Sequence, residues 1–210
     1  MPLGTLYTLP SSPRSSFLVS LIKYTGLDIE IKDRSAPEFE DQFPLKKCPA
    51  YLGADGFHLT ENLAIIKYIT EISPKKYNWY GKDAKEEAKV WQWLSFFNTE
   101  FMPALCDWAL PTVGILPYNA EQIQSGIERL EKLAGLIEKQ LAKTKYLVGD
   151  EATLADLYAS EFVKGAYSGL WDESWVKEHP GIERWLGQLK TEPVVGESLK
   201  GITPASKKKE

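Results

Sequence analysis

The chain has 210 residues, of which 43% are hydrophobic and 12% aromatic, and this composition excludes an intrinsically disordered protein. The net charge of −4 disfavours nucleic acid as a partner, because phosphate binding needs a basic surface. The two cysteines, Cys48 and Cys106, lie far apart, and no histidine pair has metal-ligand spacing, so we expect neither a disulfide framework nor a metal site. The sequence has no secretory signal and no apolar run of the roughly 18 residues that span a bilayer, so we expect a cytoplasmic protein without a membrane partner.

Short strands and helices alternate in residues 1–75. A strand at 4–9 is followed by a helix that begins at Ser11 and Ser12 and carries Pro13 in its first turn. We expect the later elements to be a strand at 28–32, a short helix from 35, a hairpin within 50–59 and a helix capped by Thr60. The order β-α-β-α-β-β-α is typical of a thioredoxin-like domain.

The rest of the chain is helical in pattern. We predict a linker at 76–83, an all-helical domain at 84–200 and a charged tail at 201–210. Helices are predicted to start where a capping residue precedes an apolar periodic stretch, at Asp83, Asn119, Thr153 and His179. The first of these helices is expected to continue through Phe101.

The first candidate site lies at Ser11 and Ser12, at the start of the first helix. Backbone N–H groups and the helix dipole favour an anion there, and a thiolate at that position has its pKa lowered below the free value. A serine hydroxyl that donates to the sulfur adds to this effect. The alternative is that the two serines only cap the helix.

The second candidate site is the stretch from Lys46 to Pro49. If the Cys48–Pro49 bond is cis, the Cys48 backbone can pair with an extended peptide, and Lys46 or Lys47 can bind a terminal carboxylate. The alternative is an ordinary turn with two solvated lysines.

Glu61 and Asn62 form the third candidate site, in the first turn of the helix after Thr60. A carboxylate and free backbone N–H groups at that place can bind the ammonium and carboxylate of an amino-acid-like ligand. The alternative is that Glu61 only complements the helix dipole.

Together these motifs resemble the glutathione site of the cytosolic glutathione transferases. The resemblance extends to the helical half through the stretches 146–150, 153–156 and 179–185. It implies an α/β thioredoxin-like N-terminal domain followed by an all-α C-terminal domain, the glutathione-transferase fold. Within the family, the stretches 4–7, 43–47 and 93–96 are most similar to the transferase-like domain of translation elongation factor 1B gamma and its fungal relatives.

The resemblance also implies roles for the candidate residues. Ser12 is the expected thiolate-activating residue, with Ser11 as the substitute. Tyr7 lies on the strand where some classes of the family use a tyrosine instead, but here we expect it to have a core role. The glutathione-binding residues that the family pattern implies are Lys47, Cys48, Pro49, Glu61 and Asn62. Catalysis by the Cys48 thiol is a rival hypothesis that the serines at the first helix disfavour.

An apolar pocket for a bulky electrophile is expected in the helical domain. Its candidate residues are Phe101, Met102, Trp108, Tyr167 and Trp171, although an aromatic stripe is also typical of plain core. We therefore expect a stand-alone, homodimeric transferase or isomerase that uses glutathione as co-substrate and acts on a small apolar electrophile. The alternative function is a non-catalytic scaffold of the elongation factor 1B gamma type.

Overall fold

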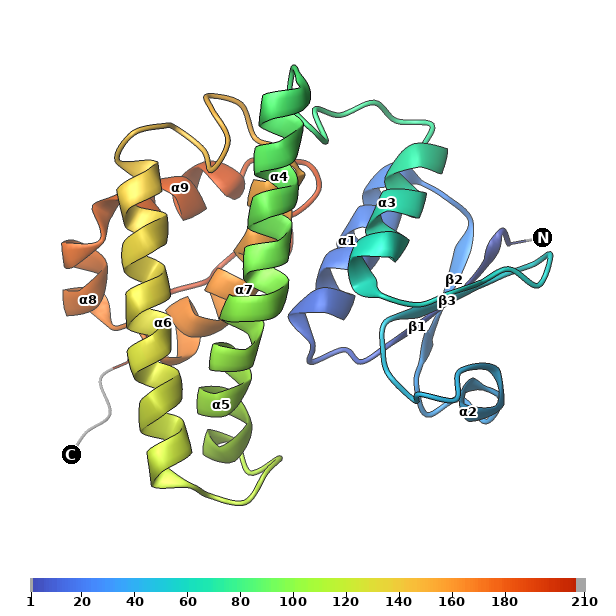
Figure 1. Ribbon diagram of the computed structural model, residues 1–210, viewed down its shortest axis with the longest axis horizontal. Helices are drawn as coiled ribbons and strands as arrows, with labels where there is room; N and C mark the ends of the chain where they lie inside the picture. The colour runs from blue at the N-terminus through green and yellow to red at the C-terminus, as the bar shows by residue number, and fades with distance from the viewer. Residues whose placement is uncertain (1, 207–210) are drawn as a thin grey trace. The chain divides into compact units, whose positions relative to one another are not determined.

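The computed structural model describes residues 2–206, which form two compact units (Figure 1). Unit 1 contains the chain up to Tyr77 and the later segment Pro193–Ser198, and unit 2 contains Asn78–Glu192 and the chain from Leu199 onward. The charged tail predicted at 201–210 lies outside the described residues from position 207.

Unit 1 is built on a four-stranded sheet with the order β2-β1-β3-β4. β1 and β2 are parallel, whereas β3 runs antiparallel to both β1 and β4. The strands are β1 (Gly4–Thr8), β2 (Ile29–Asp33), β3 (Ala50–Gly53) and β4 (His58–Leu59). The parallel β1-α-β2 unit followed by an antiparallel hairpin confirms the predicted thioredoxin-like arrangement.

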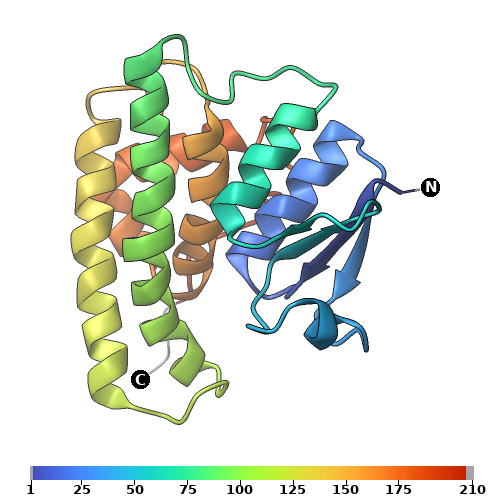
Figure 2. The same ribbon diagram turned by 45° about the vertical axis from the view of Figure 1, so that its right-hand side comes forward.

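Helices cover both faces of this sheet. Because side chains alternate along a strand, Leu6 and Tyr51 point to one face and Tyr7 and Ala50 to the other. α1 and α3 lie side by side on the first face, and α2 packs on the second through Phe39 (Figure 2). The helices are α1 (Pro13–Thr25), α2 (Phe39–Gln42) and α3 (Asn62–Ile72).

Unit 2 is entirely helical, and α7 is its central helix. Every residue of α7 from Leu154 to Val163 is buried, whereas the longer helices around it each bury only part of their residues. The elements are α4 (Ala84–Phe96), the π-helix η1 (Phe97–Phe101), α5 (Met102–Thr112), α6 (Ala120–Leu141), α7 (Leu154–Gly169), α8 (Glu173–Glu178) and α9 (Pro180–Leu189).

The predicted helix through Phe101 is not one regular α-helix. It widens into η1 just before α5, where Pro103 has no N–H to donate to the preceding turn. The predicted helix starts at Asp83 and Asn119 are confirmed, because both side chains accept backbone N–H groups of the following turn. α8 was not predicted, since six residues are too few to show a helical period.

Asp156 joins three parts of unit 2. It forms a capping box with Thr153 at the start of α7. The same carboxylate accepts hydrogen bonds from the Leu147 N–H at 2.8 Å and from the Trp185 indole N–H at 2.9 Å. A fully buried carboxylate therefore ties the loop before α7, α7 itself and α9 together.

Within residues 2–206, no helix is long and apolar enough to cross a membrane. In the same part of the chain, no group of three or more histidine, cysteine or acidic side chains is placed to hold a metal ion.

Candidate functional site

The three candidate stretches meet at one end of the unit 1 sheet. Tyr7 pairs with Ala50 in an antiparallel ladder, so the carboxyl end of β1 lies beside the start of β3. Tyr51 pairs with Leu59, so the end of β4 reaches the same edge. The loop before α1, the Cys48–Pro49 bond and the start of α3 follow or precede these strand ends and are therefore neighbours.

Ser12 is the N-cap residue of α1, but its hydroxyl does not cap the helix. Its backbone is extended, with φ −87° and ψ 127°, and its side chain makes no capping hydrogen bond. Ser12 therefore sits at the helix start as predicted, but without the side-chain bond that a capping role alone would require. Ser11 is exposed beside it. A partly exposed hydroxyl thus lies at the positive end of the α1 dipole.

The Cys48–Pro49 peptide bond is cis, as the second site requires. The Cys48 side chain packs against the cluster of Tyr7, Phe39, Phe43 and Ala50 on the α2 face of the sheet. Burial raises the pKa of the Cys48 thiol to about 11, so the thiol is protonated at neutral pH. This contradicts the rival hypothesis of a reactive Cys48 and leaves the residue its main chain for a ligand.

Two lysines precede this bond in different settings. Lys46 has a left-handed backbone with φ 50° and forms an ion pair with Glu40. Lys47 is exposed. Of the two, Lys47 is therefore the better placed to meet a carboxylate.

Glu61 has a strained backbone conformation. Its φ is 63° and its ψ is 113°, a region that residues with a side chain rarely adopt. Glu61, not the predicted Thr60, is the N-cap of α3, and its exposed carboxylate makes no capping bond. Asn62 follows as the first helical residue and is buried. Backbone strain of this kind persists only where the surrounding structure holds it, and it is found most often at ligand-binding and active sites.

Arg34 lies at the same end of the sheet and was missed by the sequence reasoning. Its backbone N–H donates to the Thr8 carbonyl at 2.9 Å, which places it beside the end of β1. Its exposed guanidinium is close enough to Cys48 to oppose the rise in the thiol pKa. A single arginine after a strand carries no local signal of its own, and only the parallel pairing of β1 with β2 reveals it.

Tyr7 has a core role, as expected. It is 2% exposed, and its hydroxyl donates to the Glu38 carboxylate at 3.2 Å. Burial, followed by the hydrogen bond to Glu38, raises the pKa of the Tyr7 hydroxyl. Tyr7 is therefore not set up to activate a thiol.

Comparison with known proteins decides the family. Residues 2–71 match the domain family "Glutathione S-transferase, N-terminal domain", and residues 101–193 match "Glutathione S-transferase, C-terminal domain". The chain belongs to the glutathione S-transferase family.

The relatives of this chain include both glutathione transferases and elongation factor 1-gamma proteins. The chain is 36% identical over 200 residues to a glutathione S-transferase-like protein of Fusarium, covering 92% of this chain and 91% of that one. It is 33% identical over 178 residues to a putative elongation factor 1 gamma homologue of Saccharomyces cerevisiae, covering 80% and 79% of the two chains. Among solved structures, the GST-like domain of elongation factor 1-gamma from Saccharomyces cerevisiae aligns with a TM-score of 0.83 at 29% identity over 98% of this chain and 96% of that one.

The residues predicted to line a substrate pocket divide into two sets in unit 2. Phe101, Tyr167 and Trp171 are almost fully buried. The Tyr167 hydroxyl donates to Glu183 at 2.7 Å, and the Trp171 indole donates to Glu131 at 3.0 Å, so their polar atoms are already engaged. These three residues pack the unit 2 core. Met102 and Trp108 are partly exposed and retain surface for a ligand.

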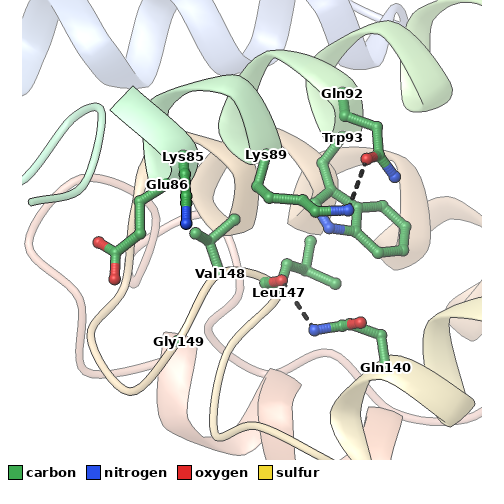
Figure 3. Close-up of a pocket in the computed structure, with 9 residues that line it drawn as sticks. All are labelled: Lys85, Glu86, Lys89, Gln92, Trp93, Gln140, Leu147, Val148 and Gly149. Atoms are coloured by element: carbon green, nitrogen blue, oxygen red, sulfur yellow. Dashed lines mark hydrogen bonds between the residues drawn. The ribbon is translucent and has the colours of Figure 1, made fainter. Parts of the chain in front are cut away.

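A surface cavity of about 230 Å³ in unit 2 lies elsewhere, between α4, α6 and the loop before α7 (Figure 3). Its wall combines polar side chains with the apolar Trp93, Leu147 and Val148. Lys89 donates to Gln92 at 2.9 Å, and Gln140 donates to the Leu147 carbonyl at 3.2 Å. The lining includes none of the five proposed substrate residues, so the cavity is not the predicted substrate pocket.

Proposed function

We propose that this transferase-family protein is a glutathione-dependent transferase or isomerase. It binds glutathione in unit 1, lowers the pKa of the glutathione thiol and presents the thiolate to an electrophilic carbon of a small apolar compound. The observation that carries this proposal is the Ser12 hydroxyl, which sits at the start of α1 without making a capping bond. We further propose that the protein acts as a cytoplasmic homodimer.

Each part of the tripeptide has a proposed partner at the end of the sheet. The Glu61 carboxylate receives the γ-glutamyl ammonium, and the backbone at Asn62 receives the neighbouring carboxylate. The Cys48 main chain, turned outward before Pro49, pairs with the cysteinyl backbone. Lys47 receives the glycyl carboxylate, and Arg34 supports the same charge.

The chemistry requires little more than positioning and thiolate stabilisation. The thiol proton leaves to solvent, and the Ser12 hydroxyl donates a hydrogen bond to the sulfur anion while the α1 dipole stabilises the charge. The sulfur then forms a bond to the electrophilic carbon. In conjugation a leaving group departs or a proton is added. In isomerisation, addition of the sulfur converts a carbon–carbon double bond into a single bond, rotation occurs about that bond, and loss of the thiolate restores the double bond.

The alternative is a scaffold without catalysis. The similarity to the yeast elongation factor domain supports it, as do the adjacent Lys46 and Lys47, which offer charge to a partner protein. A scaffold needs no activated thiol, so the two functions differ in what happens to glutathione.

The test is glutathione binding followed by titration of the bound thiol. We expect measurable heat of binding at about 5 mM glutathione, and a bound thiol that ionises below the free pKa of about 8.5. A lost hydrogen bond to a charged acceptor costs about 1.5–3 kcal/mol, so Ser12→Ala should raise the pKa of the bound thiol by about one to two pKa units. Thiolate absorbance against pH measures this, and a normal thiol pKa in the unaltered protein would support the scaffold instead.

A further inference from the structure

Ser15 is a buried hydroxyl in the first turn of α1. It is 1% exposed, and its Oγ accepts a hydrogen bond from the Leu9 N–H at 3.0 Å. This bond reaches back six residues and joins the helix to the residue that directly follows β1. A buried hydroxyl needs such a partner, so the contact is part of the fold.

Leu9 is held to the start of α1 on both sides. While its N–H donates to Ser15, its carbonyl accepts the Ser12 N–H at 2.9 Å. Pro10 occupies the second position of the turn from Leu9 to Ser12, where its fixed φ suits the turn. The loop that carries Ser12 is therefore closed at its base by two hydrogen bonds to a single residue.

Ser12 and Ser15 do not make the reciprocal capping bonds that their positions at the helix start would allow. An N-cap serine ordinarily accepts the N–H of the third helical residue, which is Ser15 here, but Ser12 makes no such bond. In a capping box the side chain of the third residue reaches back to the N-cap N–H. Here the side chain of the third residue, Ser15, accepts the N–H of Leu9 rather than that of the N-cap residue. Ser15 thus holds the loop before α1 through Leu9, while the Ser12 hydroxyl makes no hydrogen bond to the helix backbone.

We propose that Ser15 is a positioning residue for Ser12, an inference that rests on the proposed function. By holding Leu9, it keeps the Ser12 hydroxyl turned toward the sulfur of bound glutathione. Without the Ser15 oxygen, the Leu9 N–H loses its acceptor and the turn relaxes toward the ordinary capped arrangement. The Ser12 hydroxyl then bonds to the helix backbone in place of the thiolate. Ser15 itself does not touch the ligand.

The test compares the pKa of the bound glutathione thiol in four proteins: wild type, Ser12→Ala, Ser15→Ala and the double variant. Each single substitution should raise the thiol pKa by about one to two pKa units. The double variant should raise it no further than a single substitution does, because both substitutions remove the same hydrogen bond. Binding of S-methylglutathione, which has no ionisable thiol, should change less than about twofold. Ser20→Ala, the same change on the same helix, is the matched control and should leave the thiol pKa unchanged.

The outcomes separate this inference from the function on which it rests. A raised thiol pKa in Ser12→Ala but not in Ser15→Ala overturns the positioning role alone. A wild type without a lowered thiol pKa overturns the proposed function, and the positioning role with it.

A second pair of variants covers the case in which Ser15→Ala does not fold. Ser15→Cys keeps nearly the same size but offers only a weak acceptor, so it should raise the thiol pKa and speed hydrogen exchange at the Leu9 amide. Ser15→Thr keeps the oxygen and should restore both values. Fast Leu9 exchange with an unchanged thiol pKa in Ser15→Cys would reduce Ser15 to a structural residue.

Discussion

At the scale of single residues, the Cys48 side chain packs against the core, and we propose that only its backbone meets a ligand. Burial raises the thiol pKa to about 11, so almost no thiolate exists at neutral pH. We expect Cys48→Ala to keep glutathione affinity and most turnover, as measured by calorimetry and thiol consumption. Cys106→Ala is the control for loss of a thiol elsewhere. Loss of turnover in a folded Cys48→Ala protein that still binds glutathione would show that the sulfur takes part in the reaction.

Glu61 combines a charge with an unusual backbone, and two variants separate them. Glu61→Gln keeps the size and removes the charge that is proposed to meet the glutathione ammonium. We expect it to weaken binding by about 1.5–3 kcal/mol in calorimetry, with little change in unfolding free energy. Glu61→Ala also shortens the side chain and should weaken binding equally. Unchanged affinity in both would limit Glu61 to complementing the α3 dipole.

At the scale of elements, the packing of α5 against α6 depends on Gly126. A Cβ at this position would lie 2.6 Å from the Trp108 backbone nitrogen and 3.0 Å from the Ala104 carbonyl oxygen. Gly126→Ala must therefore push the two helices apart, and we expect a loss of about 1–3 kcal/mol of unfolding free energy in urea. Gly135 is a matched control in the same helix, because a Cβ there meets nothing within 4 Å. Gly135→Ala should add about 0.5–1 kcal/mol, and equal effects of the two changes would refute the close approach.

At the scale of the whole molecule, Asp156 couples the stability of unit 2 to pH. Burial raises the pKa of this carboxyl to about 6, against the opposing effect of four hydrogen-bond donors from Leu147, Thr153 and Trp185. The folded state then binds more protons than the unfolded state between about pH 4 and 6, so this group's contribution to stability falls as pH rises through that window. The span of about two pKa units corresponds to about 3 kcal/mol.

Asp156→Asn removes this titration and isolates it from all other groups. The stability of the wild type relative to the variant, from urea unfolding, should be about 2–2.5 kcal/mol greater at pH 4 than at pH 7. A difference that instead grows toward pH 7 would mean that the donors outweigh burial and that the carboxylate is the preferred form.

The sequence predicts most of the elements, because their signals are local. Pro13 and Gly26 bracket α1, and Asp83 and Asn119 start their helices as capping chemistry requires. The exceptions are also local in origin. η1 precedes Pro103, whose effect on the helix is hidden within a long apolar helical pattern. α8 is shorter than two turns, too short to show a helical period.

The candidate site is less predictable, because it depends on competition and on distant pairing. Ser12 makes no capping bond and the Ser15 hydroxyl accepts from the Leu9 N–H, and the sequence records neither choice. Arg34 joins the site only through the register of two strands. The aromatic pattern that includes Phe101 and Trp171 has the same spacing whether it forms a pocket or a core.

The backbone of Glu61 has a consequence for the time course of ligand capture. A residue held at φ 63° and ψ 113° is fixed by its surroundings before any ligand arrives, so folding has already met the ordering cost at this edge of the site. If glutathione binds here as proposed, the tripeptide meets a backbone that is already set, and binding need not wait for a slow rearrangement of the protein. We then expect the association rate to be set by diffusional encounter, and selectivity among thiol peptides by their dissociation rates.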